Sequence, residues 1–233
     1  IANAKDLQNW PNLNVERTVD GNEVVTIFYN TESGSLATKE FRQALTYAIN
    51  HSEFDGESAS GPISPISWAY ASTQRYEYNI GKAKGLLAKS QEKNFKVTLS
   101  TTQDLKDLAE KIKSDWEAIG VKTEIKIEEN VPETFEALLI LNQLKPDPDQ
   151  YSLWHSTQKA TNITKIKDAK IDKLLEDGRN TQEEEKRKEI YEDFQKAVVE
   201  QSPASFLYYP YKYVVTYKNI GKLFSKIPNQ KLY

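Results

Sequence analysis

Apolar and polar positions along the first part of the chain predict strands and helices in turn. Residues 23–30 are rich in β-branched and aromatic side chains, a composition typical of a strand. A helix is expected from residue 38 or 39 to residue 49, because apolar side chains recur on one face: Phe41, Ala44, Leu45, Ala48 and Ile49. Residues 51–79 have no regular period, and a short helix is expected over residues 82–89.

The clearest unit is a strand, a helix and a second strand between residues 95 and 127. Residues 95–100 and 121–127 alternate apolar and polar side chains, as half-buried strands do. Residues 104–119 carry an apolar stripe at helical spacing, and Gly120 stands where a helix stops. Such a crossover makes the two strands parallel. Because parallel strands need helices over them, the pattern predicts a mixed sheet flanked by helices, an α/β fold.

The second half of the chain is predicted to be mostly helical. Residues 131–137 predict a helix that leads into the apolar residues 138–140, and the prolines of the loop at residues 144–156 exclude regular structure there. Two helices are expected over residues 169–178, which end at Gly178, and over residues 182–201. Extended segments follow Pro203. The core then covers residues 24–217 of one domain, and the tail, residues 218–233, shows no clear element.

Composition and charge exclude several classes of protein. The net charge is −3, with 31 basic and 34 acidic residues mixed along the chain, so no basic surface for a nucleic acid is expected. The absence of cysteine excludes disulfides and thiolate chemistry, and no apolar run is long enough to span a membrane. The chain opens on Ile1 without an export leader, so we expect a processed or excised piece, or part of something longer.

No residue pattern predicts catalysis, a bound metal or a cofactor. The chain has two histidines and no GxSxG elbow to hold a nucleophile beside one of them. Neither His51 nor His155 stands in an HExxH or comparable ligand spacing, and the nine glycines form no GxGxxG loop. His51 follows a helix end, where a cation stabilises the helix dipole.

Two segments carry groups suited to ligand recognition. One loop holds two carboxylates, two aromatic rings and an imidazole: Asp147, Asp149, Tyr151, Trp154 and His155. A proline-stiffened loop loses little entropy on binding, which favours a ligand role. The alternative is that both aspartates cap turns and that Trp154 belongs to the core. The irregular residues 51–79 contain Trp68 and Tyr70, either in a ligand-facing loop or in a connection packed on the surface.

Six ordered motifs resemble a known family. In chain order they are KEFRQALTYAIN at residues 39–50, GPISPISWAY at 61–70, KAKGLL at 82–87, PDPDQYSLWHS at 146–156, DKLLEDGR at 172–179 and YEDFQ at 191–195. Together they are similar to the bacterial extracellular solute-binding proteins of family 5, the dipeptide- and oligopeptide-binding proteins of ABC importers. Six motifs in the right order are far more specific than one.

The resemblance implies a periplasmic-binding-protein-like fold, in which two lobes close over a peptide and backbone hydrogen bonds supply much of the affinity. Members of the family are more than twice as long as this chain, which therefore resembles the second, C-terminal lobe alone. The implied partners are short peptides, the missing N-terminal lobe of the same protein and an ABC importer permease. The implied location is extracellular, as a cell-surface lipoprotein or in the periplasm.

The chain departs from the family pattern at three places. Many members hold the amino terminus of the peptide with an aspartate where this chain has Leu144, so that anchor does not carry over; Asp147 and Asp149 are the nearest carboxylates. The segment between residues 49 and 61 is shorter than in most members. The tail past Tyr217 lacks the closing strand of the family.

The following residues are expected to face the cleft between the lobes: Trp68, Tyr70, Asp147, Asp149, Tyr151, Trp154, His155 and Asn162. The aromatic rings would supply apolar contact area there, and the aspartates charge complementarity. Two other functions stay open, a solute-binding protein for a metal complex or a small sugar chain, and a stand-alone interaction module that has lost transport. A large exposed apolar face would favour an excised lobe, and a polar face the module. An enzyme is the remote alternative.

Overall fold

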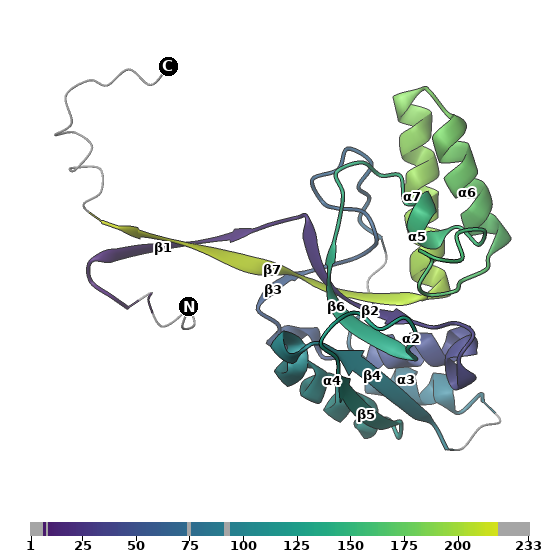
Figure 1. The fold of residues 1–233 in the computed structure, drawn as a ribbon, viewed down its shortest axis with the longest axis horizontal. Coiled ribbons are helices and arrows are strands. Elements are labelled where there is room, and N and C mark those ends of the chain that lie inside the picture. Colours follow the sequence, from purple (N-terminus) through teal and green to yellow (C-terminus); the bar gives the residue numbers. More distant parts are fainter. Residues whose placement is uncertain (1–6, 8, 74–75, 91–93, 219–233) are drawn as a thin grey trace.

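The computed structural model describes residues 7, 9–73, 76–90 and 94–218, and Figure 1 shows their arrangement. A seven-stranded mixed sheet has the order β1-β7-β2-β6-β4-β5, with β3 paired to β7. Its strands are β1 (Leu13–Val19), β2 (Glu23–Tyr29), β3 (Gly56–Ser58), β4 (Lys96–Thr101), β5 (Lys122–Ile127), β6 (Ala137–Gln143) and β7 (Ala204–Tyr217). The expected mixed α/β fold is confirmed.

Helices cover both faces of this sheet. They are α2 (Lys39–Ala48), α3 (Ile80–Leu87), α4 (Lys106–Ala118), α5 (Tyr151–Trp154), α6 (Ala169–Asn180) and α7 (Glu184–Gln201), with short 3-10 turns η1 (Gly34–Ala37), η2 (His51–Glu53) and η3 (Gln103–Leu105). Alternate residues of β2 point to opposite faces. Val25 and Ile27 therefore join a core with α2, α3 and α4, whereas Val24 and Phe28 join a second core with α5, α6 and α7.

Side-chain caps and one glycine explain several helix ends. The Asn79 Oδ1 accepts from the Lys82 N–H at 2.8 Å at the start of α3. Asp168 caps α6 in the same way, through the N–H groups of Lys170 and Ile171. Gly120 follows α4 with a φ of +90°, a backbone conformation that favours glycine. The stop predicted there is confirmed, and so is the parallel pairing of β4 with β5.

A buried arginine ties α2 to the end of α7. Arg42 is 2% exposed, and its Nη2 donates to the Gln201 carbonyl at 2.7 Å while its Nε donates to the Ser202 carbonyl at 3.0 Å. Its Nη1 donates to the Leu36 carbonyl at 2.7 Å. Burial lowers the pKa of Arg42 to about 10, which leaves it charged at neutral pH. These hydrogen bonds satisfy carbonyls near the ends of η1 and α7, and the last carbonyls of a helix have no partner within it.

The strands β1 and β7 continue beyond the rest of the sheet as a two-stranded ribbon (Figure 1). Leu13 pairs with Tyr217 and Val19 with Tyr211, and the Lys218 N–H donates to the Asn12 carbonyl at 3.0 Å. Both described ends of the chain therefore lie together at the tip of the ribbon. Large apolar side chains are exposed along it and at its tip: Trp10, Val214, Val215 and Tyr217.

Three sequence predictions are wrong. The loop at residues 144–156 was expected to contain no regular structure, but its second half forms the short helix α5. The expected helix over residues 131–137 is absent from the described structure: residues 131–136 form neither helix nor strand, and Ala137 begins β6. The apolar run that follows, residues 137–141, suits a buried strand as well as a helix. Gly178 does not end α6, which continues to Asn180. A Cβ on Gly178 would lie 2.9 Å from Cζ of Tyr191, so the glycine permits close packing of α6 on α7.

Residues 219–233 of the expected tail lie outside the described residues. No helix among the residues that the structure describes is long and apolar enough to cross a membrane.

Candidate ligand-binding face

The carboxyl ends of three parallel strands meet at one end of the sheet. Thr101 of β4 lies opposite both Ile127 of β5 and Leu139 of β6. In open α/β sheets, ligands bind just outside the carboxyl ends of the strands. A ligand site is therefore expected at this end of the sheet.

Beyond Leu139, β6 has a neighbouring strand on one side only among the described residues. On that side it pairs with β2, from Tyr29 opposite Ala137 to Glu23 opposite Gln143. On the other side the pairing with β4 stops at Leu139. Within the described part of the chain, residues 140–143 therefore present an open strand edge, which we call the β6 edge.

The hydrogen-bond alternation of an antiparallel ladder shows which backbone groups face this edge. The Leu144 N–H donates to the Asn22 carbonyl at 2.6 Å, and the Asn30 N–H donates to the Glu136 carbonyl at 2.8 Å. The even-numbered residues of β6 thus bond to β2. The odd-numbered Leu141 and Gln143 direct their N–H and C=O groups away from β2, where an added strand can bond them.

Exposed apolar side chains stand at the same end of the sheet. Leu141 of β6 is 43% exposed and Ile127 of β5 is 39% exposed, while Val131, in the segment after β5, is 57% exposed. Open backbone groups beside apolar side chains suit an extended chain, which needs both.

The proline-rich loop after β6 is fixed by turns and by α6. The Asp149 N–H donates to Oδ1 of Asp147 at 2.8 Å, and the Tyr151 N–H donates to Oδ1 of Asp149 at 3.0 Å. Both aspartates therefore cap turns, which was the alternative to a ligand role. Burial raises the pKa of Asp149, but hydrogen bonds from Arg179 and from the Tyr151 N–H outweigh it and hold that pKa below its usual range. Asp147 is exposed.

Tyr151 contacts both a cation and an imidazole. The Arg179 guanidinium carbon is 3.9 Å from the centre of the Tyr151 ring, and the His155 ring stacks on the same tyrosine with 4.1 Å between the ring centroids. The Thr157 N–H donates to Nδ1 of His155, so Nε2 carries the proton and faces Oε1 of Glu176 at 3.3 Å. Asp149, Tyr151 and His155 are thus brought together, on the surface of α6.

Three predicted cleft residues are buried, which corrects the expectation that their side chains face a ligand. His155 is 3% exposed, beneath the Tyr151 ring that stacks on it. Trp154 is 1% exposed and packs on Phe28 and Phe206. Asn162 is 2% exposed, and its Nδ2 donates to the Ile166 carbonyl at 2.9 Å. Trp154 fills the core, and Asn162 holds the shape of the loop.

Trp68 and Tyr70 lie in the loop at residues 61–70. Trp68 is 37% exposed and makes an edge contact with Tyr191, while the Tyr70 hydroxyl lies 3.1 Å from Oγ of Ser60. The Ser64 Oγ donates to the Gly21 carbonyl at 2.7 Å, which places this loop against the turn between β1 and β2. Ligand contact by Trp68, Tyr70, Asp147, Asp149 and Tyr151 stays a prediction.

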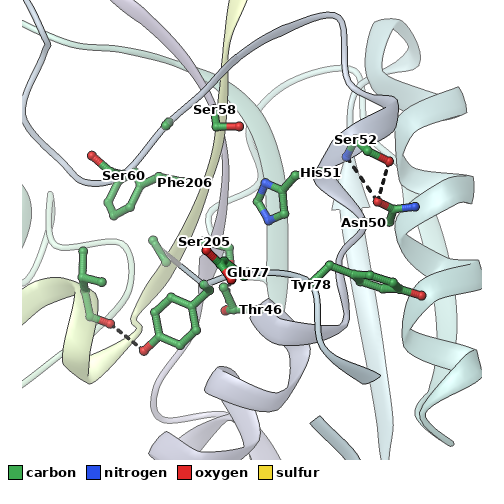
Figure 2. Close-up of a pocket in the computed structure, with 14 residues that line it drawn as sticks. Thr46, Asn50, His51, Ser52, Ser58, Ser60, Glu77, Tyr78, Ser205 and Phe206 are labelled. Carbon is green, nitrogen blue, oxygen red and sulfur yellow. Dashed lines mark hydrogen bonds between the residues drawn. The ribbon is translucent and has the colours of Figure 1, made fainter. Parts of the chain in front are cut away.

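The sequence did not single out two features of the structure. The β6 edge lies in the apolar run at residues 137–141, and only the end of its pairing with β4 identifies it. The second feature, which we call the β7 pocket, has a volume of about 310 Å³ and is lined by several separate segments (Figure 2). Thr46, His51, Ser60, Glu77 and Ser205 are among the residues that line it. No contiguous motif links these residues, so no sequence signal could have assembled them.

Most of the chain matches one known protein family. The family model for the bacterial extracellular solute-binding proteins, family 5 Middle, matches residues 1–165. The chain belongs to this family. The resemblance carried by the six motifs is thereby confirmed, and members of the family are extracellular solute-binding proteins.

Individual family members agree with this assignment. The oligopeptide-binding protein AppA of Bacillus subtilis is 30% identical, over 84% of this chain and 43% of AppA. Heme-binding protein A of Haemophilus influenzae is 29% identical, over 78% of this chain and 38% of that protein. The chain thus spans about two fifths of the length of these relatives.

Solved structures confirm the periplasmic-binding-protein-like fold. AppA of Bacillus subtilis, solved in complex with a nonapeptide, matches with a TM-score of 0.81 at 28% identity, over 93% of this chain and 50% of that chain. NikZ of Campylobacter jejuni, solved in complex with Ni(L-His), matches with a TM-score of 0.79 at 24% identity, over 93% and 50% of the two chains. At 24% identity, the likeness to NikZ concerns the fold alone. Within the described residues, no group of three or more His, Cys, Asp or Glu side chains is placed to hold a metal ion.

Proposed function

We propose that the chain is one lobe of an extracellular two-lobe protein that binds short peptides and delivers them to an ABC importer. The β6 edge is the observation that carries this proposal. An extended peptide adds to such an edge through main-chain hydrogen bonds to Leu141 and Gln143, whatever its side chains are. The kinship with AppA supports a peptide as the ligand.

The amine of the peptide needs a partner other than position 144. Leu144 is 5% exposed, and its own N–H is bonded to Asn22. Asp147 is the nearest exposed carboxylate along the chain, and its Oδ1 is engaged in a turn. The remaining carboxylate oxygen of Asp147 is the group that we assign to the ligand amine.

The missing N-terminal lobe of the same protein is the partner that completes the cleft. The ribbon of β1 and β7 supports this part of the proposal, because it extends beyond the rest of the sheet (Figure 1). Exposed Val214 and Tyr217 give the ribbon apolar surface for a second lobe to cover. Such an assembly would act outside the membrane, as a surface lipoprotein or in the periplasm, beside an importer permease and without a catalytic step.

A non-peptide solute is the second candidate. Heme-binding protein A of Haemophilus influenzae is nearly as similar to this chain as AppA is. A heme or a metal chelate has no peptide main chain, so it cannot form the main-chain hydrogen bonds to the β6 edge that a peptide forms.

Calorimetric titration of the complete protein, encoded by the open reading frame that contains this chain, tests the proposal. A mixture of three- to nine-residue peptides is expected to bind with micromolar affinity or better. The 233 residues alone are expected to bind weakly or undetectably, because they offer half of the cleft. Micromolar peptide binding by these residues alone would refute the single-lobe assignment. Binding of heme or Ni(L-His) by the complete protein, with no response to peptides, would replace the ligand class.

A further inference from the structure

The β7 pocket is separate from the β6 edge. The strands β6 and β7 flank β2 on opposite sides, and the pocket lies beside residues 204–206 of β7, toward the Phe28 end of β2. The eight residues that the sequence singled out for the cleft do not line it. A ligand in this pocket would therefore not compete for the open strand edge.

The floor of the pocket is held in place by a closed set of hydrogen bonds. The Ser205 Oγ lies 2.7 Å from the Tyr29 hydroxyl and 2.6 Å from Oγ1 of Thr46. The Thr46 Oγ1 donates to the Arg42 carbonyl at 2.9 Å. On the wall, the Tyr76 hydroxyl donates to the Val199 carbonyl at 2.9 Å. These groups are already bonded, so they shape the pocket without demanding a particular polar ligand.

The described lining of the pocket carries one carboxylate and one imidazole, that of His51. Glu77 is the one carboxylate among the described lining residues, and neither lysine nor arginine lines the pocket there. Figure 2 shows Glu77 between His51 and Thr46, with Tyr78 to one side and Phe206 to the other. A carboxylate that no lysine or arginine of the described lining neutralises attracts a cation to this position.

Aromatic rings complete a surface suited to an organic cation. Tyr76, Tyr78 and Phe206 all line the pocket, and Tyr78 is 50% exposed. Aromatic faces attract ammonium groups, and quaternary ammonium ligands in particular are bound by such rings. A volume of about 310 Å³ suits a small molecule, because ligand pockets begin near roughly 300 Å³.

We propose that the β7 pocket is a second ligand site, which binds a small organic ammonium ion through the Glu77 carboxylate and the rings of Tyr78 and Phe206. The site is independent of the cleft and of the peptide function proposed above. Because its floor is apolar or already hydrogen-bonded, it selects for positive charge and for size.

Choline and its uncharged isostere 3,3-dimethylbutan-1-ol test this proposal, by NMR titration of this chain. Choline is expected to shift resonances of the residues around the pocket, whereas the isostere shifts them weakly or not at all. Glu77→Gln is expected to raise the dissociation constant for choline by roughly fivefold or more, as expected for a charge-assisted contact. Glu57→Gln is the matched control, because Glu57 is an exposed glutamate of β3 outside the lining.

Three outcomes would overturn the proposal. The first is that choline at roughly millimolar concentration, where even a weak ligand is bound, causes no response. The second is that choline and its isostere bind equally well. The third is that Glu77→Gln leaves the affinity for choline unchanged. Amide spectra of each variant show whether it has folded, so a misfolded Glu77→Gln is replaced by Glu77→Ser before it is titrated. The titration contains no peptide, so its result is distinct from that of the peptide experiment.

Discussion

Arg179 holds Asp149 through two nitrogens, with Nη2 at 2.7 Å and Nε at 2.9 Å from Oδ2 of the carboxylate. The other oxygen, Oδ1, accepts from the Tyr151 N–H. The Asp149 carboxylate thereby joins the proline-rich loop to α6, and it accepts the backbone N–H of Tyr151, the first residue of α5. The loop is therefore folded onto the lobe before any ligand arrives.

Asp149→Asn is expected to lower the free energy of unfolding by about 1 kcal/mol at pH 7, because the pair is partly exposed and screened. The asparagine keeps an oxygen for the Tyr151 N–H. The pKa of Asp149 is lowered in the folded protein from the ordinary 3.8. The stabilisation is therefore present above pH 3.8 and is lost as the pH falls through the lower pKa of the folded state.

Urea unfolding of the wild type and of Asp149→Asn between pH 7 and pH 3 measures this difference. It is expected to shrink at the acid end of the range. Asp147→Asn serves as the control, because Asp147 also accepts a turn hydrogen bond, from the Asp149 N–H, whereas Arg179 bonds to Asp149. A difference between wild type and Asp149→Asn that is the same at every pH would contradict an ionic contribution.

Gly178→Ala is expected to destabilise the protein by about 1–2 kcal/mol, although alanine favours a helix. The new methyl group would lie 2.9 Å from Cζ of Tyr191, so α6 and α7 would have to separate. Gly85→Ala is the matched control, in α3, where a Cβ meets no atom within 4 Å. It is expected to stabilise by about 0.5–1 kcal/mol. Thermal unfolding of both variants decides the matter, and a stabilised Gly178→Ala would disprove the packing argument.

The sequence predicted the fold where local and global preferences agree. Residues 95–127 form the expected crossover because strand alternation, helical stripe and the stop at Gly120 all favour the same structure. Residues 131–137 were assigned wrongly because the apolar run that follows them, residues 137–141, fits a helix and a buried strand equally well. Only its pairing with β2 and β4 distinguishes the two, and that pairing joins distant parts of the chain.

The candidate site was harder to predict because the same residue types serve structure and binding. Trp154 and Asp149 stand in a motif shared with the family, yet one fills the core and the other fixes a turn. The β6 edge depends on where β4 stops, a property of neither strand alone. Leu141 and Gln143 carry no side-chain signal for it, since their backbone groups make the edge.

Trp154→Phe is expected to destabilise the chain by about 1–2 kcal/mol, through the loss of buried ring atoms. Its Nε1 has no hydrogen-bond partner among the described residues, so no polar contact is lost. Peptide affinity of the complete protein is expected to stay within about twofold, because the ring lies in the core. Chemical unfolding and calorimetry on the same variant separate the two effects. A tenfold loss of affinity without loss of stability would show that Trp154 contacts the ligand.

A peptide bound as an added strand is expected to show a period of two in its main-chain contacts. Only alternate residues of an added strand direct their N–H and C=O groups to the β6 edge, where Leu141 and Gln143 face it. Single N-methylation along one tight-binding peptide removes one N–H at a time. Affinity of the complete protein is expected to fall roughly fivefold or more at alternate positions, as about 1 kcal/mol per hydrogen bond implies, and to change little between them. Equal losses at every position, or losses at the amino terminus alone, would mean that the peptide is held by its ends and not by the edge of β6.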